Sequence, residues 1–201
     1  MVAGAIVSDE FNKGTIKSLL IVPFKRSQIL GAKFITVLLM VSIISLITLI
    51  FELIVGGVMF GFGSLNVPVL AYNYSTGNMM FYNIFRYLLI MFGINSLYII
   101  MLGLISFVLS VLITNTAFSI AASFCLIVVA DIINNLVMIK DIKVLKYLLT
   151  LNWNFSQYAF GAIPAFKYIN LKFKIFVYLA YFIILLLIAF IVFKKRDIKN
   201  I

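Results

Sequence analysis

The sequence predicts an all-α membrane protein, a helical bundle that crosses the bilayer several times. Hydrophobic residues make up 65% of the 201-residue chain and charged residues 11%, whereas soluble domains have roughly 45–50% and about 25%. Several stretches are apolar over the roughly 20 residues that a helix needs to cross a bilayer. Because no internal repeat or low-complexity linker divides the chain, we expect residues 1–201 to form a single transmembrane domain.

The chain opens with seven small or apolar residues, Met1–Val7, followed by Ser8-Asp9-Glu10. Seven residues are too few to cross a membrane. They also lack the basic start and the cleavage site of a signal peptide. We therefore expect a short N-terminal helix remnant, the inner end of a helix whose start is missing.

Four full spans follow, each with no more than one or two charges. We place them at Phe34–Val58, Phe85–Ile113, Thr116–Met138 and Ile175–Phe193. The connection over residues 59–84 contains Gly61, Gly63, Pro68 and Asn73 and is expected to lie outside. The connection over residues 139–174 is rich in Trp, Tyr and Phe, which favour the headgroup level. There we expect an outer interfacial connection built of two short half-helices; a fifth crossing is the alternative.

Basic residues orient the chain. They precede the first span at Lys13, Lys17, Lys25, Arg26 and Lys33, and they follow the last at Lys194, Lys195, Arg196 and Lys199. Four crossings bring both clusters to one face, which the positive-inside rule makes cytoplasmic. We expect a multi-pass protein of the bacterial cell membrane with both termini inside. Six lysines in the connection over residues 139–174 oppose this orientation. The even number of crossings and the compact basic clusters near both termini outweigh them.

The net charge of +10 has a simple interpretation in a membrane protein. It indicates contact with anionic lipids and signals for orientation, not binding of nucleic acid. The one cysteine, Cys125, lies in an apolar run and has no partner for an internal disulfide.

Residues 8–33 are the most informative segment. Pro23 lacks an N–H and disfavours helix in the residue before it, and Ser27 is a candidate N-cap for the helix that leads into the first span. Apolar and charged residues fall on different sides at helical spacing, namely Ile16, Leu19, Leu20 and Pro23 against Glu10, Lys13 and Lys17. This pattern predicts a short surface helix near Thr15–Val22, a hinge, and then a transmembrane helix. The alternative is an ordinary basic juxtamembrane loop.

A family resemblance rests on this segment. The pattern Glu10-x-x-x-Gly14-Thr15-x-Lys17-x-Leu19-Leu20-x-x-Pro23-x-x-Arg26-x-x-Ile29-x-x-x-Lys33 resembles the cytoplasmic segment between the second and third spans of type-2 ABC exporter permeases. These are the membrane subunits of bacterial drug, bacteriocin-immunity, sodium and polysaccharide exporters. Over the rest of the chain, only the order and spacing of the spans agree. The family normally has six spans, and this chain begins at the last residues of the second.

The resemblance implies a function and partners. In that family the segment is a cytoplasmic coupling helix that docks on an ABC ATPase subunit, and two permeases work as a homo- or heterodimer. It therefore assigns this chain to an ATP-driven exporter of unknown substrate and assigns partner-ATPase coupling to residues 8–33. The residues that carry this role are Glu10, Gly14, Thr15, Lys17, Leu19, Leu20, Pro23, Arg26 and Lys33.

The absence of certain residues and motifs from the sequence excludes several kinds of catalytic site. The chain contains no histidine, so it has no histidine general base and no histidine metal ligand. It has no G-x-x-x-x-G-K-[ST] sequence to bind ATP. We expect no enzymatic activity, no cofactor and no resident metal in this chain, and ATP hydrolysis by a separate subunit. The alternatives are a non-transporting scaffold or immunity protein, a truncated non-functional permease fragment, and, with only Glu52 and Asp131 to work with, an intramembrane enzyme.

Polar residues inside the spans are candidates for an intramembrane path. Glu52, Arg86 and Asp131 all lie toward the outer ends of their spans. A buried Glu52–Arg86 pair would relieve the cost of an isolated charge in hydrocarbon; all three could instead hold helices together or lie close to headgroups. Serines at fourfold spacing, Ser106 with Ser110 and Ser119 with Ser123, predict close helix packing.

Overall fold

A computed structural model describes residues 2–15, 24–62, 68–73, 77–140, 143–161 and 169–196. Its four long helices are α4 (Arg26–Phe60), α5 (Ile84–Leu112), α6 (Thr116–Lys140) and α8 (Leu171–Lys195). Each is long and apolar enough to cross a membrane. The mostly helical fold with four candidate spans is therefore confirmed.

The first long helix begins earlier than its apolar run. Helix α4 starts at Arg26, and its N-cap is Lys25, not Ser27. The Lys25 backbone N–H donates to the Gln28 side-chain oxygen over 3.0 Å, which satisfies a donor at the helix start. The basic turn before Phe34 is thus helical, because polar and charged residues can continue a helix beyond the hydrocarbon.

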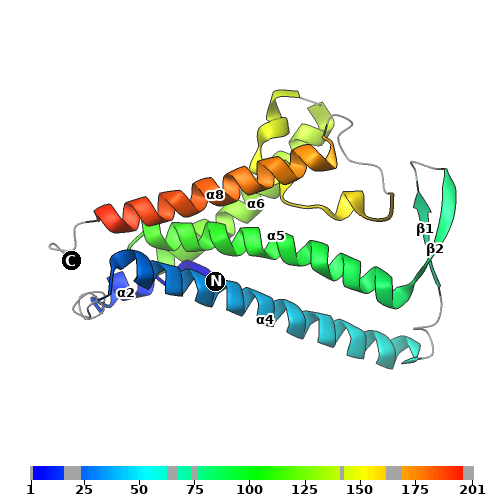
Figure 1. Ribbon diagram of the computed structural model, residues 1–201, viewed down its shortest axis with the longest axis horizontal. Helices are drawn as coiled ribbons and strands as arrows, with labels where there is room; N and C mark the ends of the chain where they lie inside the picture. Colours follow the sequence, from blue (N-terminus) through cyan, green and yellow to red (C-terminus); the bar gives the residue numbers. More distant parts are fainter. Residues whose placement is uncertain are drawn as a thin grey trace.

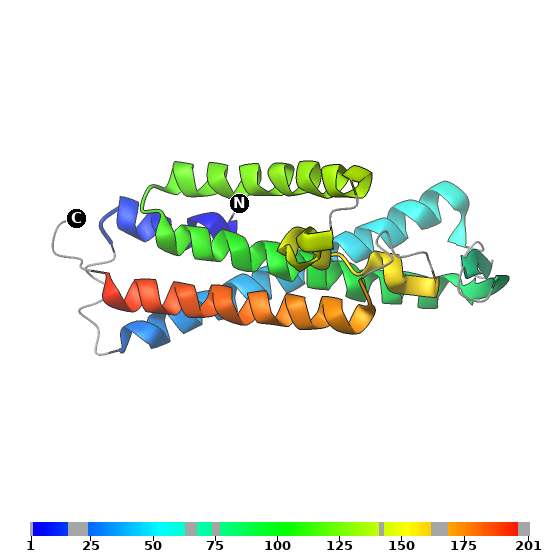
Figure 2. The same cartoon turned by 90° about the horizontal axis from the view of Figure 1, so that it is seen from above.

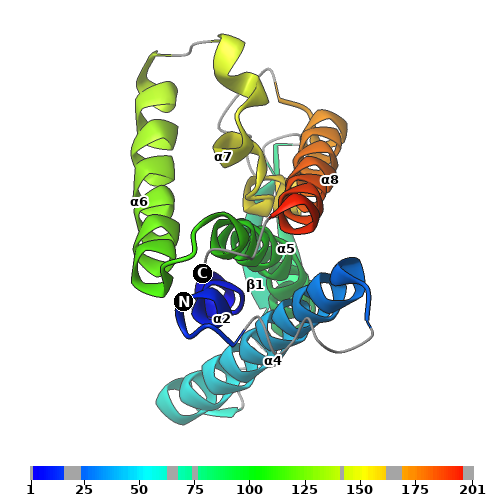
Figure 3. The ribbon, with the colours of Figure 1, turned by 90° about the vertical axis from the view of Figure 1, so that its left-hand side faces the viewer.

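Helix α5 is the centre of the bundle. Viewed from one end, it lies between α6, α8, α4 and the N-terminal helices α1 (Val2–Ala5) and α2 (Ser8–Asn12) (Figure 3). The same order is visible from above, where α5 runs between α6 and α8 while α4 crosses at an angle (Figure 2). Its C-terminal half carries much of the buried core, including Met101, Leu104, Phe107, Val108 and Val111. Packing is therefore densest toward the end of the bundle where α5 ends.

That end, which we call the basic end, brings the two terminal regions together (Figure 1). The Arg26 guanidinium donates to the backbone carbonyls of Lys194 (3.3 Å) and Arg196 (2.9 Å). Arg196 donates to the carbonyls of Val111 and Leu112. The beginning of α4, the end of α5 and the end of α8 thus share one face, as the sequence predicts for four crossings.

The opposite end contains an element that the sequence analysis missed. Strands β1 (Pro68–Asn73) and β2 (Asn78–Asn83) form an antiparallel hairpin between α4 and α5, with Pro68 opposite Asn83 and Asn73 opposite Asn78. We call this end the hairpin end. The sequence analysis did not predict these two strands, which are a small addition to a mostly helical fold. The Tyr82 ring packs edge-on against Phe160 at 4.7 Å, so the hairpin rests on the later connection.

The connection between α6 and α8 also lies at the hairpin end (Figure 1). Its described part contains η2 (Lys143–Tyr147), α7 (Leu149–Asn152) and η3 (Ser156–Gly161). These are short helical pieces, as expected, but there are three of them and two are 3₁₀ turns. Since α6 arrives at this end and α8 leaves from it, the described chain makes no fifth crossing here.

Candidate functional site

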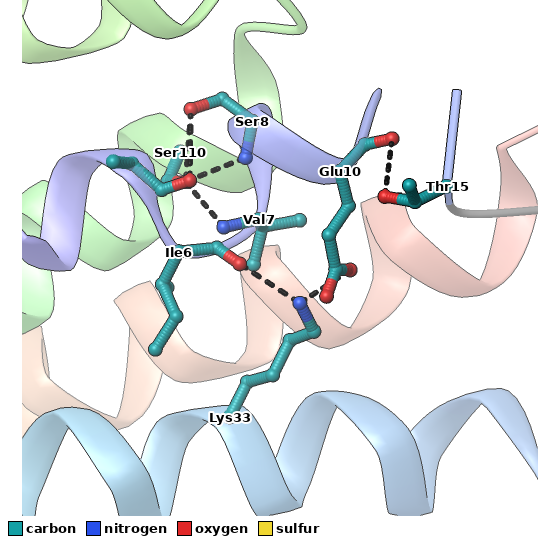
Figure 4. Close-up of polar contacts among 8 residues, drawn as sticks. Ile6, Val7, Ser8, Glu10, Thr15, Lys33 and Ser110 are labelled. Atoms are coloured by element: carbon teal, nitrogen blue, oxygen red, sulfur yellow. Dashed lines mark hydrogen bonds and ion pairs between the residues drawn. The ribbon is translucent and has the colours of Figure 1, made fainter. Parts of the chain in front are cut away.

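The N-terminal segment is broken where it enters the bundle. Helices α1 and α2 are separated by a turn at Ile6 and Val7, so backbone groups there lose their helical partners. Ser110 of α5 supplies the acceptor for two of these groups. Its Oγ accepts hydrogen bonds from the backbone N–H groups of Val7 and Ser8, each over 2.9 Å (Figure 4). Val7, Ser8 and Ser110 are all fully buried. In a membrane, freed backbone groups must be satisfied by neighbouring side chains.

A short chain of hydroxyls completes this contact. The Ser110 hydroxyl donates to Ser8 Oγ over 3.3 Å, and the Ser8 hydroxyl donates to the Gly4 carbonyl over 2.9 Å. The fourfold serine spacing predicted close packing in this region, and Ser110 does allow α2 to approach α5. Nothing in the sequence indicated that the Ser110 oxygen accepts hydrogen bonds from a helix break 102 positions away.

Lys33 ties the same break to α4. Its ammonium group donates to the Ile6 carbonyl over 2.8 Å and forms an ion pair with the Glu10 carboxylate (Figure 4). The Lys33 side chain is 12% exposed and that of Glu10 is 24% exposed. One side chain of α4 therefore holds both the broken turn and helix α2.

A third attachment reaches α8. Phe11 of α2 is buried and meets the Phe193 ring edge-on at 6.4 Å. The Arg196 guanidinium lies 4.8 Å from the centre of the Phe11 ring while it donates to the carbonyls at the end of α5. Partial burial lowers the pKa of Arg196 from its ordinary value. Residues 6–11 are thus anchored to α4, α5 and α8 together; we call this arrangement the anchor.

Beyond the anchor, residues 12–15 are exposed. Helix α2 ends at Asn12, and Gly14 has a φ of +69°, a left-handed conformation that stops the helix. The expected stripe of Glu10, Lys13 and Lys17 along one helix is therefore wrong: Lys13 instead pairs with Asp9 on the surface at 2.7 Å. Thr15 Oγ1 lies 3.5 Å from the Glu10 carbonyl.

The remaining predicted coupling residues are divided between described and undescribed parts of the chain. Lys17, Leu19, Leu20 and Pro23 lie outside the described residues, so the helix expected near Thr15–Val22 stays a prediction. Arg26 is described and holds the C-terminal carbonyls of Lys194 and Arg196.

The three charged residues of the candidate intramembrane path are not brought together. Glu52, Arg86 and Asp131 are all exposed on the surface of the single chain. The ion pairs among the described residues are Lys13–Asp9 and Lys33–Glu10, so Glu52 and Arg86 do not pair. Glu52 lines a groove between α4 and α5.

Comparison with known proteins places the chain in a family. The profile of a family described as "Protein of unknown function (DUF2705)" matches residues 1–199. The chain belongs to the DUF2705 family. One relative, the uncharacterized protein YhcI of Bacillus subtilis (strain 168), is 34% identical over 200 residues, which cover all of this chain and 63% of YhcI. A second relative, the uncharacterized membrane protein YdbK of the same organism, is 30% identical over 199 residues, or 99% of this chain and 76% of YdbK.

The name of YdbK describes a membrane protein, in agreement with the four candidate spans of this chain. The chain spans less than two thirds of the length of YhcI. No solved structure matches it.

Proposed function

We propose that this chain is the membrane-spanning permease subunit of an ATP-driven exporter, with ATP hydrolysed by a separate ABC ATPase subunit. The observation that carries the proposal is the anchor: residues 6–11 are held against α4, α5 and α8 at the basic end. The segment that follows resembles the coupling segment of type-2 ABC exporter permeases. It follows helix α2, which ends at Asn12, and precedes α4, which begins at Arg26. A partner that grips this segment therefore pulls on a part of the chain that is fastened to three candidate spans.

The anchor suggests how motion would pass into the membrane. When ATP binding closes the ATPase subunits, the coupling segment moves with them. Lys33 joins residues 6 and 10 directly to α4, so a displacement of this segment tilts the first span. Ser110 transmits the same displacement to α5. Tilting of these helices would switch access to a path between two permease copies.

The contacts also divide the coupling residues into two roles. Glu10 and Lys33 face each other inside the anchor, so we propose that they brace the segment rather than touch the ATPase. Gly14, in its left-handed conformation, ends the helix that the anchor holds. Contact with the ATPase then falls to the residues after Gly14, namely Thr15, Lys17, Leu19, Leu20 and Pro23, with Arg26 fixing the return to α4.

In this proposal the basic end faces the cytoplasm of a bacterial cell. Arg26, Lys33 and Lys194 then lie near the anionic headgroups of the inner leaflet, in keeping with the positive-inside rule. A pair of permeases, either two copies of this chain or this chain and a related one, would enclose the transport path.

Co-purification tests the proposal. The tagged chain is expressed in its native host, extracted in mild detergent and analysed by mass spectrometry, and we expect a P-loop ATPase to co-purify in a stoichiometric amount. Lys17→Glu should abolish this association, because it reverses a charge in the proposed contact. Lys172→Glu, which reverses an exposed charge at the hairpin end, is the matched control and should retain it.

Two results would reject the exporter assignment. One is a wild-type chain that purifies without any P-loop protein. The other is a Lys17→Glu variant that binds the ATPase as well as the control does. A chain whose cellular activity survives inactivation of the partner's ATP hydrolysis would instead be a scaffold or immunity protein.

A further inference from the structure

The groove between α4 and α5 combines polar side chains with a single acidic group. It has a volume of about 400 Å³. On α4, Ser45, Thr48 and Glu52 recur at spacings of three and four residues, which places them on one side of the helix. Across the groove, α5 contributes Asn95 and Tyr98 together with Phe92. A groove with these side chains is unlike the surrounding helix surfaces, which are apolar and suited to lipid.

The groove lies in the half of the bundle nearer the hairpin end. Glu52 follows Lys33 by 19 residues, which is about 28 Å along the helix axis. The hydrocarbon core is about 30 Å thick, so with Lys33 at one boundary, Glu52 lies close to the other. A ligand could therefore reach the carboxylate from the outer leaflet or from outside.

The groove offers hydrogen-bond acceptors and a negative charge. The Ser45 hydroxyl donates to the Ser42 carbonyl (2.9 Å) and the Thr48 hydroxyl donates to the Ser45 carbonyl (2.7 Å), so both hydroxyl hydrogens are already used. Glu52 and Asn95 make no hydrogen bond or ion pair with any residue that the structure describes. Arg86 is not among the residues that line the groove. The site therefore has an anionic centre without a cation of its own.

We propose that this groove binds an organic cation with an apolar body. An unpaired carboxylate at the edge of the hydrocarbon core attracts positive charge, and a cationic ligand supplies that charge. Its charge would meet Glu52, while Phe92, Met91 and Leu88 offer apolar surface to its body. As a statement about the exported substrate, this inference rests on the proposed function. As a statement about binding, it requires no ATPase.

The test uses two probes of nearly equal size and opposite charge. The full chain is reconstituted in nanodiscs of zwitterionic lipid without the ATPase, and binding of tetraphenylphosphonium and tetraphenylborate is measured by equilibrium dialysis. We expect saturable binding of the cation and at least tenfold weaker binding of the anion. Glu52→Gln should weaken cation binding at least tenfold. Asp9→Asn removes an equal charge from an exposed position at the basic end, far from the groove, and should leave binding unchanged.

A second variant guards against a failure of Glu52→Gln to fold. Asn95→Lys leaves Glu52 in place and adds a positive charge to the groove, and we expect it to weaken cation binding at least tenfold while the thermal unfolding curve stays that of the wild type. The proposal is overturned if both probes bind equally, or if Glu52→Gln folds and binds the cation like the wild type. It is also overturned if Glu52→Cys cross-links between two copies and the wild type binds no cation, because the groove would then be an interface between copies. Each of these failures leaves the co-purification test of the exporter unaffected.

Discussion

Lys33 of α4 and Glu10 of α2 form an ion pair at the point where the N-terminal segment enters the bundle, and Lys33 also donates to the Ile6 carbonyl. Both side chains are mostly shielded from solvent. The pair therefore differs from Lys13–Asp9, which is only a few residues away but has side chains that are 66% and 40% exposed. The two pairs form a matched comparison within one segment.

A double-mutant cycle should separate the two pairs. For Glu10→Gln and Lys33→Met we expect a coupling free energy of about 1–3 kcal/mol, because hydrogen bonds to charged groups are strong when partly buried. Lys33→Met alone should cost more than Glu10→Gln alone, since it also leaves the Ile6 carbonyl without its donor. Asp9→Asn with Lys13→Met should give a coupling below about 0.5 kcal/mol. The free energies of unfolding of the single and double variants, measured in detergent, give both coupling free energies. Equal values for the two pairs would contradict the role of Lys33 and Glu10 in the anchor.

The Ser110 hydroxyl should be essential to the anchor. Ser110→Ala leaves the buried N–H groups of Val7 and Ser8 without an acceptor, and we expect a loss of about 2–3 kcal/mol in the free energy of unfolding. Ser42→Ala is the control, because Ser42 is exposed and only donates to the Leu38 carbonyl of its own helix. Its effect should stay below about 0.5 kcal/mol. If the two variants unfold alike, Ser110 does not hold the segment.

Lys174 at the hairpin end should be a source of instability. Its side chain is fully buried, and its ammonium group has no hydrogen-bond partner within the described ranges. It lies 5.2 Å from the centre of the Tyr158 ring and 5.6 Å from that of Phe155. Such cation–π contacts stabilise the ammonium group by roughly 2 kcal/mol. This is less than the several kcal/mol that burial of an ion costs.

Lys174→Met keeps a long flexible side chain and removes the charge. We expect it to raise the free energy of unfolding by about 1–3 kcal/mol, whereas Lys172→Met, at an exposed position two residues earlier, should change little. Thermal unfolding in detergent compares the three proteins. A loss of stability in Lys174→Met would mean that the ammonium group has an anionic partner in the folded protein.

The long helices could be predicted because a bilayer sets a simple requirement of length and composition. The apolar runs did not predict where the helices begin. Helix α4 starts at Arg26, although its apolar run starts at Phe34, because the thickness of the hydrocarbon sets the length of the apolar run and not that of the helix. The even number of crossings also predicted that the two basic clusters lie at one end of the bundle. Arg26 and Arg196 do lie together there.

The hairpin and the anchor could not be predicted in the same way. In β1 and β2, apolar residues occupy both faces, so no clear alternation distinguishes Met79 or Leu70, which are exposed, from Met80 or Val69, which are half-buried. The ion pair considered as one possibility for Glu52 and Arg86 does not form, because position along two helices does not fix the direction of either side chain. Ser110 was singled out for its spacing with Ser106, but its partners, the backbone N–H groups of Val7 and Ser8, belong to a distant helix break.

The sidedness of the coupling segment is the central claim, and thiol labelling measures it directly. In a Cys125→Ser background, Ser18→Cys places one thiol in this segment and Met79→Cys places one on the exposed face of the hairpin. A membrane-impermeant maleimide added to intact cells should label Met79→Cys at once and Ser18→Cys only after the cells are permeabilised. Labelling of Ser18→Cys in intact cells would contradict the account, because a segment outside the cell cannot bind a cytoplasmic ATPase.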